Sequence, residues 1–186
     1  MGVIVAIFGI VVAHHDAKEI YAEPIALIGC APATQSEATR ATVVHLADNP
    51  PSIVGPVHYT AKVAERVQFE AGGELLRKIP PGKQLFLVSQ ADPSSSDLDG
   101  NRGNGKYYRR DALTVTGTCW LFPQSSISYH GASGLTFRMS LILVDDDRVA
   151  DFKSKTRDGC DDATLNSLGV IRLAFFEVPT SDLNER

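Results

Sequence analysis

Several patterns that mark common enzyme and scaffold classes are missing from this chain of 186 residues. It has only three cysteines and no C-x-x-C pair, which argues against a disulfide scaffold and against a zinc site. Its five histidines form no H-x-H or H-x-x-x-H pair, so metal binding by histidine is not expected. No G-x-S-x-G string marks a nucleophile elbow. We therefore predict a protein with no catalytic activity of its own and no cofactor.

A surplus of basic residues is also lacking. Lysine and arginine number 18 against 22 aspartates and glutamates, which gives a net charge of −4 at pH 7. Nucleic-acid-binding domains usually carry a basic surface, so we predict no nucleic-acid partner. The hydrophobic content of 44% is ordinary for a globular protein, and this length suits one domain with a single sizeable core.

The longest apolar run extends from Val3 to Ala13, and the first charged residue is Asp16. As a helix this run would cover about 17 Å, roughly half of a bilayer's hydrocarbon core. No basic residue precedes Lys18, as a signal peptide would require. We read residues 1–15 as a partial membrane anchor, because the run lacks alternation and ends at polar residues. The alternative is a strand or helix buried in the core of a cytoplasmic domain.

The rest of the chain has the period-two pattern of β-strands separated by turn-rich loops. Alternation over 57–70 predicts a half-buried strand with a bulge or a hairpin end near Glu65. An aspartate-capped helix is expected over 145–156, with Val149 and Phe152 on its buried side. Other strands are predicted over 20–29, 40–47, 84–90, 107–115, 117–122, 134–145 and 168–179.

Seven or eight strands and one short helix predict an all-β protein, a β-sandwich. In this reading, residues 16–56 form a linker and the first strands, residues 57–180 form the core of the sandwich, and residues 181–186 form a tail.

Four segments together resemble bacterial extracytoplasmic immunoglobulin-like modules. These are IPPGKQLFLVSQ (79–90), GKYYRRDALTVTGTCWLF (105–122), GLTFRMSLILVDDDRVADF (134–152) and LGVIRLAFFEVP (168–179). The resemblance covers about residues 57–179 and implies an immunoglobulin-like sandwich that follows a transmembrane helix. The chain has Arg109 and Arg110 where that family's pattern has Pro-Gln. The family offers no catalytic residues to transfer.

The segment DLDGNRGNG places Asp97, Asp99 and Asn101 at alternate positions, as in a calcium-binding loop. The sixth position is Arg102 instead of glycine and the twelfth is Tyr108 instead of glutamate, so the match is incomplete. Turn-forming loops also use these residue types. The alternative function is thus a calcium- or carbohydrate-dependent sandwich binder, or a hydrolase, that uses the acidic loops 97–105 and 145–162.

A basic and aromatic group at Tyr107, Tyr108, Arg109 and Arg110 is the predicted contact surface for a protein or surface-glycan partner. On a strand the two tyrosines face opposite sides, as do the two arginines, so one tyrosine is expected in the core.

Trp120 is expected in the core, which places its neighbour Cys119 on the opposite face. A disulfide between Cys119 and Cys160 is the predicted pairing if the helix folds back over the sheet. In a reducing compartment all three cysteines would be thiols.

The sequence as a whole favours a membrane-anchored binding module outside the cytoplasm. A soluble cytoplasmic effector-associated domain is the remaining alternative.

Overall fold

The computed structural model describes residues 30, 40–42, 45–46, 54–63, 66–110, 113–127 and 134–180. The apolar run within residues 1–15, the strand predicted over 20–29 and the tail at 181–186 lie outside these residues. Among the helices of the described ranges, none has the length and apolar character needed to cross a bilayer.

Most of the described chain is β-structure, as predicted. The strands are β1 (Arg40–Thr42), β2 (His45–Leu46), β3 (Val54–Val63), β4 (Val67–Leu75), β5 (Lys83–Ala91), β6 (Tyr107–Arg109), β7 (Thr114–Thr116), β8 (Cys119–Ser126), β9 (Thr136–Asp145) and β10 (Ile171–Pro179). The helices are the 3-10 turn η1 (Asp146–Arg148) and the α-helices α2 (Val149–Lys155) and α3 (Asp162–Ser167).

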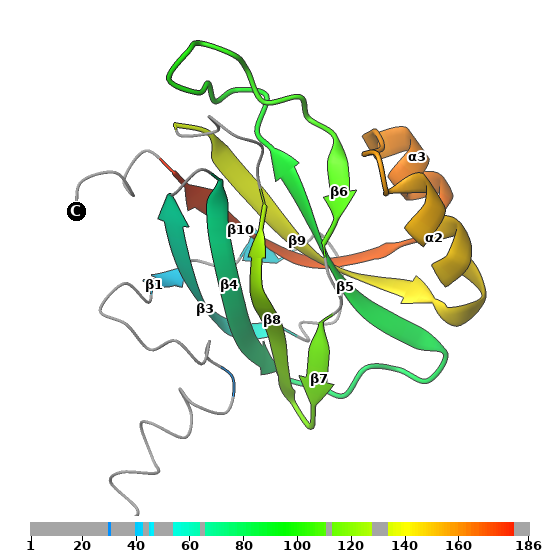
Figure 1. Ribbon diagram of the computed structural model, residues 1–186. Coiled ribbons are helices and arrows are strands. Elements are labelled where there is room, and N and C mark those ends of the chain that lie inside the picture. The colour runs from blue at the N-terminus through cyan, green and yellow to red at the C-terminus, as the bar shows by residue number, and fades with distance from the viewer. Residues whose placement is uncertain are drawn as a thin grey trace, which may run out of the picture.

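The strands form two five-stranded antiparallel sheets that face each other (Figure 1). Sheet A has the order β1-β3-β4-β8-β7, and sheet B has the order β2-β10-β9-β5-β6. The single strand predicted over 40–47 is wrong, because β1 pairs with β3 in sheet A while β2 pairs with β10 in sheet B. The chain therefore crosses from one sheet to the other within this short segment.

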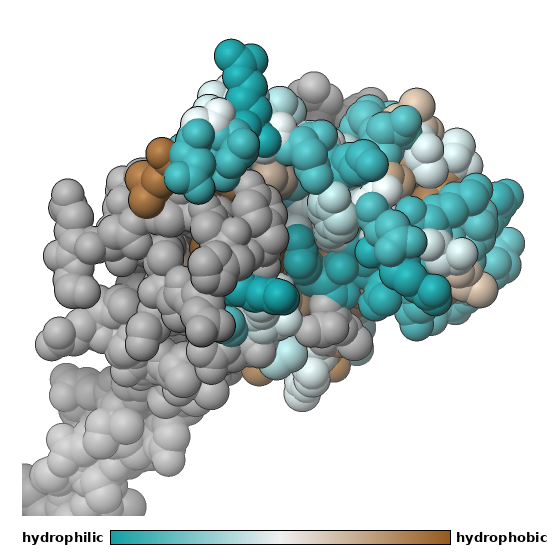
Figure 2. All heavy atoms as spheres, turned by 45° about the horizontal axis from the view of Figure 1, so that its top comes forward, coloured by the Kyte–Doolittle hydropathy of each residue, from teal (hydrophilic) through white to brown (hydrophobic). Residues whose placement is uncertain are grey.

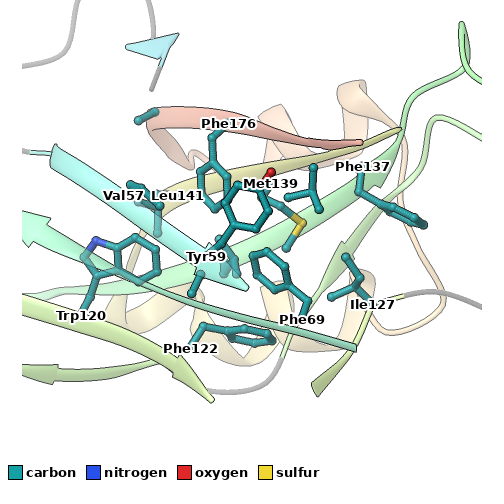
Figure 3. Packing of buried hydrophobic residues seen from close by; sticks show 14 of the residues in the cluster. Val57, Tyr59, Phe69, Trp120, Phe122, Ile127, Phe137, Met139, Leu141 and Phe176 are labelled. Atoms are coloured by element: carbon teal, nitrogen blue, oxygen red, sulfur yellow. The ribbon is translucent and has the colours of Figure 1, made fainter. Parts of the chain in front are cut away.

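Alternating side chains of both sheets fill the space between them (Figure 3). Phe69 and Phe122 from sheet A lie with ring centroids 5.7 Å apart, and Phe69 stacks on Phe176 from sheet B at 6.3 Å. Trp120 and Met139 are fully buried in the same cluster. Aromatic side chains bury large apolar areas, so this layer is the main source of stability.

The alternation over 57–70 is divided between two strands. β3 and β4 form an antiparallel pair in which Val63 lies opposite Val67. The hairpin end predicted near Glu65 is therefore confirmed. Val57, Tyr59 and Phe69 are all buried between the sheets, as their spacing predicted.

Sheet B is buried on both faces, since the helices cover the side that faces away from sheet A (Figure 1). Phe86 and Ile142 of the sheet pack with Phe152 of α2 and Leu165 of α3. The ring centroids of Phe86 and Phe152 are 4.8 Å apart. Strand β5, apolar on both faces in the sequence, is central to this three-layer arrangement.

The helix predicted over 145–156 is confirmed as η1 followed by α2, with Val149 and Phe152 buried. The Asp145 side chain makes no capping hydrogen bond at η1. The helix α3 is not among the elements that the sequence predicted. Its N-cap is Asp161, whose carboxylate accepts a hydrogen bond from the Thr164 backbone N–H at 2.7 Å.

Candidate functional site

Cys119 forms a disulfide with Cys30, not with Cys160. The predicted pair is wrong because the two cysteines lie on different layers. Trp120 points into the core, so Cys119 projects from the outer face of sheet A. Cys160 is buried on the helix side of sheet B, where burial raises the pKa of its thiol. The core and sheet B therefore separate the two sulfur atoms.

The predicted contact residues around β6 divide between the two faces of sheet B. Tyr107 is buried on the helix side, where its hydroxyl accepts a hydrogen bond from Arg172 Nη1 at 3.1 Å. Arg109 lies on this same side by alternation. Tyr108 and Arg110 lie on the other side, and the Arg110 guanidinium is 5.8 Å from the centre of the Tyr108 ring. The structure thus brings together Tyr108 and Arg110 only.

The Tyr108 side chain is fixed by its neighbours. Asn104 Nδ2 donates a hydrogen bond to the tyrosine hydroxyl at 2.8 Å. The ring also lies against the backbone of Gly159, where a Cβ atom would be 2.6 Å from two ring carbons. Because Gly159 has a φ of +82° as well, a larger residue there would strain the backbone and displace the ring.

Arg110 connects the two sheets at this end of the sandwich. Its Nε donates a hydrogen bond to Ser89 Oγ of β5 at 2.5 Å. Its Nη2 donates to the carbonyl oxygen of Ile127, the residue that follows β8, at 3.0 Å. Hydrogen bonds from a charged donor are stronger than neutral ones, so this guanidinium is held in place.

These residues border a cavity of about 360 Å³, which we call the sheet-end cavity. Ile127 and Phe137 lie at one end of the core, away from Trp120 (Figure 3). The described lining consists of three apolar residues, Ala91, Ile127 and Phe137, and four polar ones, Arg102, Asn104, Tyr108 and Arg110. Such a combination of apolar walls and a few polar groups is typical of small-molecule sites.

The loop that follows β5 supplies Arg102 and Asn104 to the cavity. It folds on itself, because the Gly103 N–H donates to the Ser95 carbonyl at 3.1 Å and the Gly105 N–H donates to the Ala91 carbonyl at 3.2 Å. The surface at this end of the molecule is mostly hydrophilic in the described part of the chain (Figure 2).

Asp97 is buried at the centre of this loop. Its carboxylate accepts hydrogen bonds from the backbone N–H groups of Asp99 (3.0 Å) and Asn101 (2.7 Å), and from Asn101 Nδ2 (3.0 Å). Asp99 and Asn101 are exposed. Over the residues that the structure describes, no three His, Cys, Asp or Glu side chains form a group that could hold a metal ion. The hydrogen bonds of the Asp97 carboxylate therefore close the loop. Calcium binding at Asp97, Asp99 and Asn101 stays the alternative raised by the sequence pattern.

A second polar cluster lies at the start of α3. Arg172 Nη2 donates to Asp162 Oδ1 at 2.5 Å and to Asn166 Oδ1 at 3.1 Å. The hydrogen bond from Arg172 to Asp162 lowers the pKa of the Asp162 carboxyl below its ordinary value. Arg172 also lies 5.0 Å from the centre of the Tyr107 ring. The cluster joins α3 to sheet B, so we assign it a structural role.

Sequence reasoning did not single out Arg102 and Asn104 as binding residues, although both lie in the loop 97–105 that the alternative function uses. In the sequence Arg102 is only a mismatch within a calcium-like pattern, and nothing local connects it to Ile127 or Phe137. The only early signal was the proximity of the loop to the Tyr108 strand. Comparisons of the chain with protein-family models, with curated proteins and with solved structures find no match.

Proposed function

We propose that this chain is a binding module without catalytic activity, and that the sheet-end cavity is its ligand site. The observation that carries the proposal is the convergence of Arg102, Asn104, Tyr108 and Arg110 on one apolar cavity. The polar groups are two guanidiniums, an amide and a phenol. Guanidiniums stay protonated, so they act as binding groups and not as general bases. We propose binding on this basis.

We also infer that the sandwich is of the immunoglobulin type. Immunoglobulin sandwiches have the strand order A-B-E-D in one sheet and G-F-C in the other, with C′ added beside C in some classes. If β3 is strand A, the order β3-β4-β8-β7 corresponds to A-B-E-D. The order β10-β9-β5-β6 then corresponds to G-F-C-C′. In this assignment α2 and α3 lie between strands F and G.

The proposed location is outside the cytoplasm, with residues 1–15 as the membrane anchor. The disulfide between Cys30 and Cys119 supports this proposal, since disulfides persist in oxidising compartments and are rare in the cytoplasm. Alkylation under denaturing conditions without a reductant, applied directly to the cells, followed by mass measurement, tests the location. One modified cysteine is expected, and three would favour the cytoplasmic alternative.

A thermal-shift screen of a small-molecule library tests the binding function. The wild type is compared with Ala91→Leu, which places a larger side chain in the cavity, and with Ala163→Leu, the same change at an exposed position of α3. Ligands of the cavity should raise the melting temperature of the wild type and of Ala163→Leu but not that of Ala91→Leu. If no compound stabilises the wild type, or if all three proteins respond equally, the proposal is wrong.

A further inference from the structure

We propose that the sheet-end cavity takes a small amphipathic anion, an organic acid with an apolar body and one carboxylate. This inference rests on the proposed function and specifies its ligand. The apolar body would lie against Ile127 and Phe137, and the carboxylate would pair with Arg102.

The charge of the lining favours an anion. The chain as a whole has a net charge of −4, yet the described lining has two arginines and no carboxylate. Arg102 is exposed and forms no ion pair with any residue that the structure describes. A planar guanidinium matches a carboxylate with two parallel hydrogen bonds, which suits Arg102 to this role.

Arg110 adds positive charge from a fixed position. Its hydrogen bonds to Ser89 and Ile127 hold the guanidinium beside the cavity before any ligand arrives. Such a preorganised charge favours an anion without the cost of ordering a free side chain. The two arginines therefore have different roles. Arg102 forms the direct hydrogen bonds to the carboxylate, and Arg110 contributes a fixed positive charge near it.

The size and character of the walls favour a small ligand with an apolar body. About 360 Å³ is near the lower end of the range for ligand pockets, which starts at roughly 300 Å³. Ala91, Ile127 and Phe137 offer no hydrogen bonds from their side chains. A polar glycan would lose its hydration against these walls without compensation. A medium-chain acid avoids this cost.

Calorimetric titration of the full chain with octanoate tests the proposal. Octanol has no charge, octylamine has the opposite charge and acetate lacks the apolar body. Octanoate should bind more tightly than all three. Arg102→Gln should weaken octanoate binding about tenfold, since a hydrogen bond to a charged group is lost. Arg77→Gln, the same change at an exposed position beyond β4, should leave the affinity unchanged.

The outcomes separate this proposal from the broader one. One outcome is that octanol binds as tightly as octanoate, with both affinities lost in Ala91→Leu and unchanged in Arg102→Gln. This result would show that the cavity is a ligand site and that the anion inference is wrong. If octanoate does not bind the wild type, the anion inference fails, and the library screen separately decides the binding function. Arg102 is exposed, so its variant should fold and the test stays decisive even if Ala91→Leu does not fold.

Discussion

Gly72 lies in direct contact with the backbone of Cys30. A Cβ atom at position 72 would be 2.3 Å from the Cys30 carbonyl oxygen and 2.7 Å from Leu121 Cδ2. Gly72 pairs with Leu121 across β4 and β8, two residues from Cys119 on β8. The glycine therefore leaves room for the Cys30 carbonyl group to lie against β4 beside its disulfide partner Cys119.

We predict that Gly72→Ala destabilises the protein and reduces disulfide formation. The Cys30 carbonyl is backbone and must shift to avoid the new methyl group, so the contact cannot be relieved by a side-chain rotation. The measurement is the number of alkylated cysteines by mass, together with the melting temperature. In a Cys30→Ser/Cys119→Ser background the same change should lower the melting temperature by a smaller amount. An equal cost in both backgrounds would contradict the role assigned to Gly72.

Loss of the disulfide itself should lower the free energy of unfolding by about 2–4 kcal/mol. The bond closes a loop with a sequence separation of 89 residues, so its main effect is on the entropy of the unfolded chain. Urea denaturation of Cys119→Ser against the wild type measures the difference. Treatment with a reductant should shift the wild type to the midpoint of the variant, and no shift in either case would show that the bond contributes nothing.

The general architecture could be predicted from the sequence because strand burial is a local pattern. The alternation of Val57, Tyr59 and Phe69 predicted one buried face, and these three residues are buried. The adjacent pair Tyr107 and Tyr108 was correctly expected to divide between two faces. Both inferences need only the period of two.

The features that depend on tertiary contact could not be predicted. Alternation placed Cys119 on an outer face but did not specify which distant cysteine would meet it. Helix α3 has six residues and only Leu165 among them is buried, so it has too little apolar periodicity to predict a helix. Arg102 joins the cavity through a loop that is folded by its own backbone hydrogen bonds. None of these can be read from neighbouring residues.

Calcium should not change the melting temperature at millimolar concentration. The carboxylate of Asp97, the first residue of the calcium-like pattern, already accepts hydrogen bonds from donors of Asp99 and Asn101. A cation would have to replace these bonds and open the loop. Thermal melts in calcium and in chelator provide the test, with magnesium as the control cation. A calcium-specific rise would restore the calcium-dependent alternative and contradict the loop-closing role of Asp97.

Asp97→Ala should destabilise the loop, since two backbone N–H groups and one amide would lose their acceptor. Asp97→Asn keeps one acceptor oxygen and should destabilise the loop less than Asp97→Ala does. Hydrogen exchange of the amides at Asp99 and Asn101 measures the effect directly, because both should exchange faster in the alanine variant. Unchanged exchange at these two amides would show that the carboxylate does not close the loop.

Acid should weaken the link between α3 and sheet B. The hydrogen bond from Arg172 holds the pKa of Asp162 below its ordinary value, and the Thr164 N–H does the same for Asp161. A lowered carboxyl pKa in the folded state contributes stability at neutral pH, and this contribution is lost as the pH falls below about 4 and through the folded-state pKa. Asp162→Asn should therefore be less stable than the wild type at pH 7. The difference should be only roughly 0.5 kcal/mol, because the Asp162 side chain is largely exposed.

The difference between Asp162→Asn and the wild type should shrink as the pH falls through the folded-state pKa of Asp162, because the protonated carboxyl is neutral like the amide. Urea midpoints measured at several pH values provide the curve. Asp147→Asn is the matched control, since Asp147 is exposed on η1 and its side chain has no hydrogen bond or ion pair with the described residues. It should show no comparable change between pH 7 and pH 2. A constant difference for Asp162→Asn would mean that its effect comes from packing and not from the charge that pairs with Arg172.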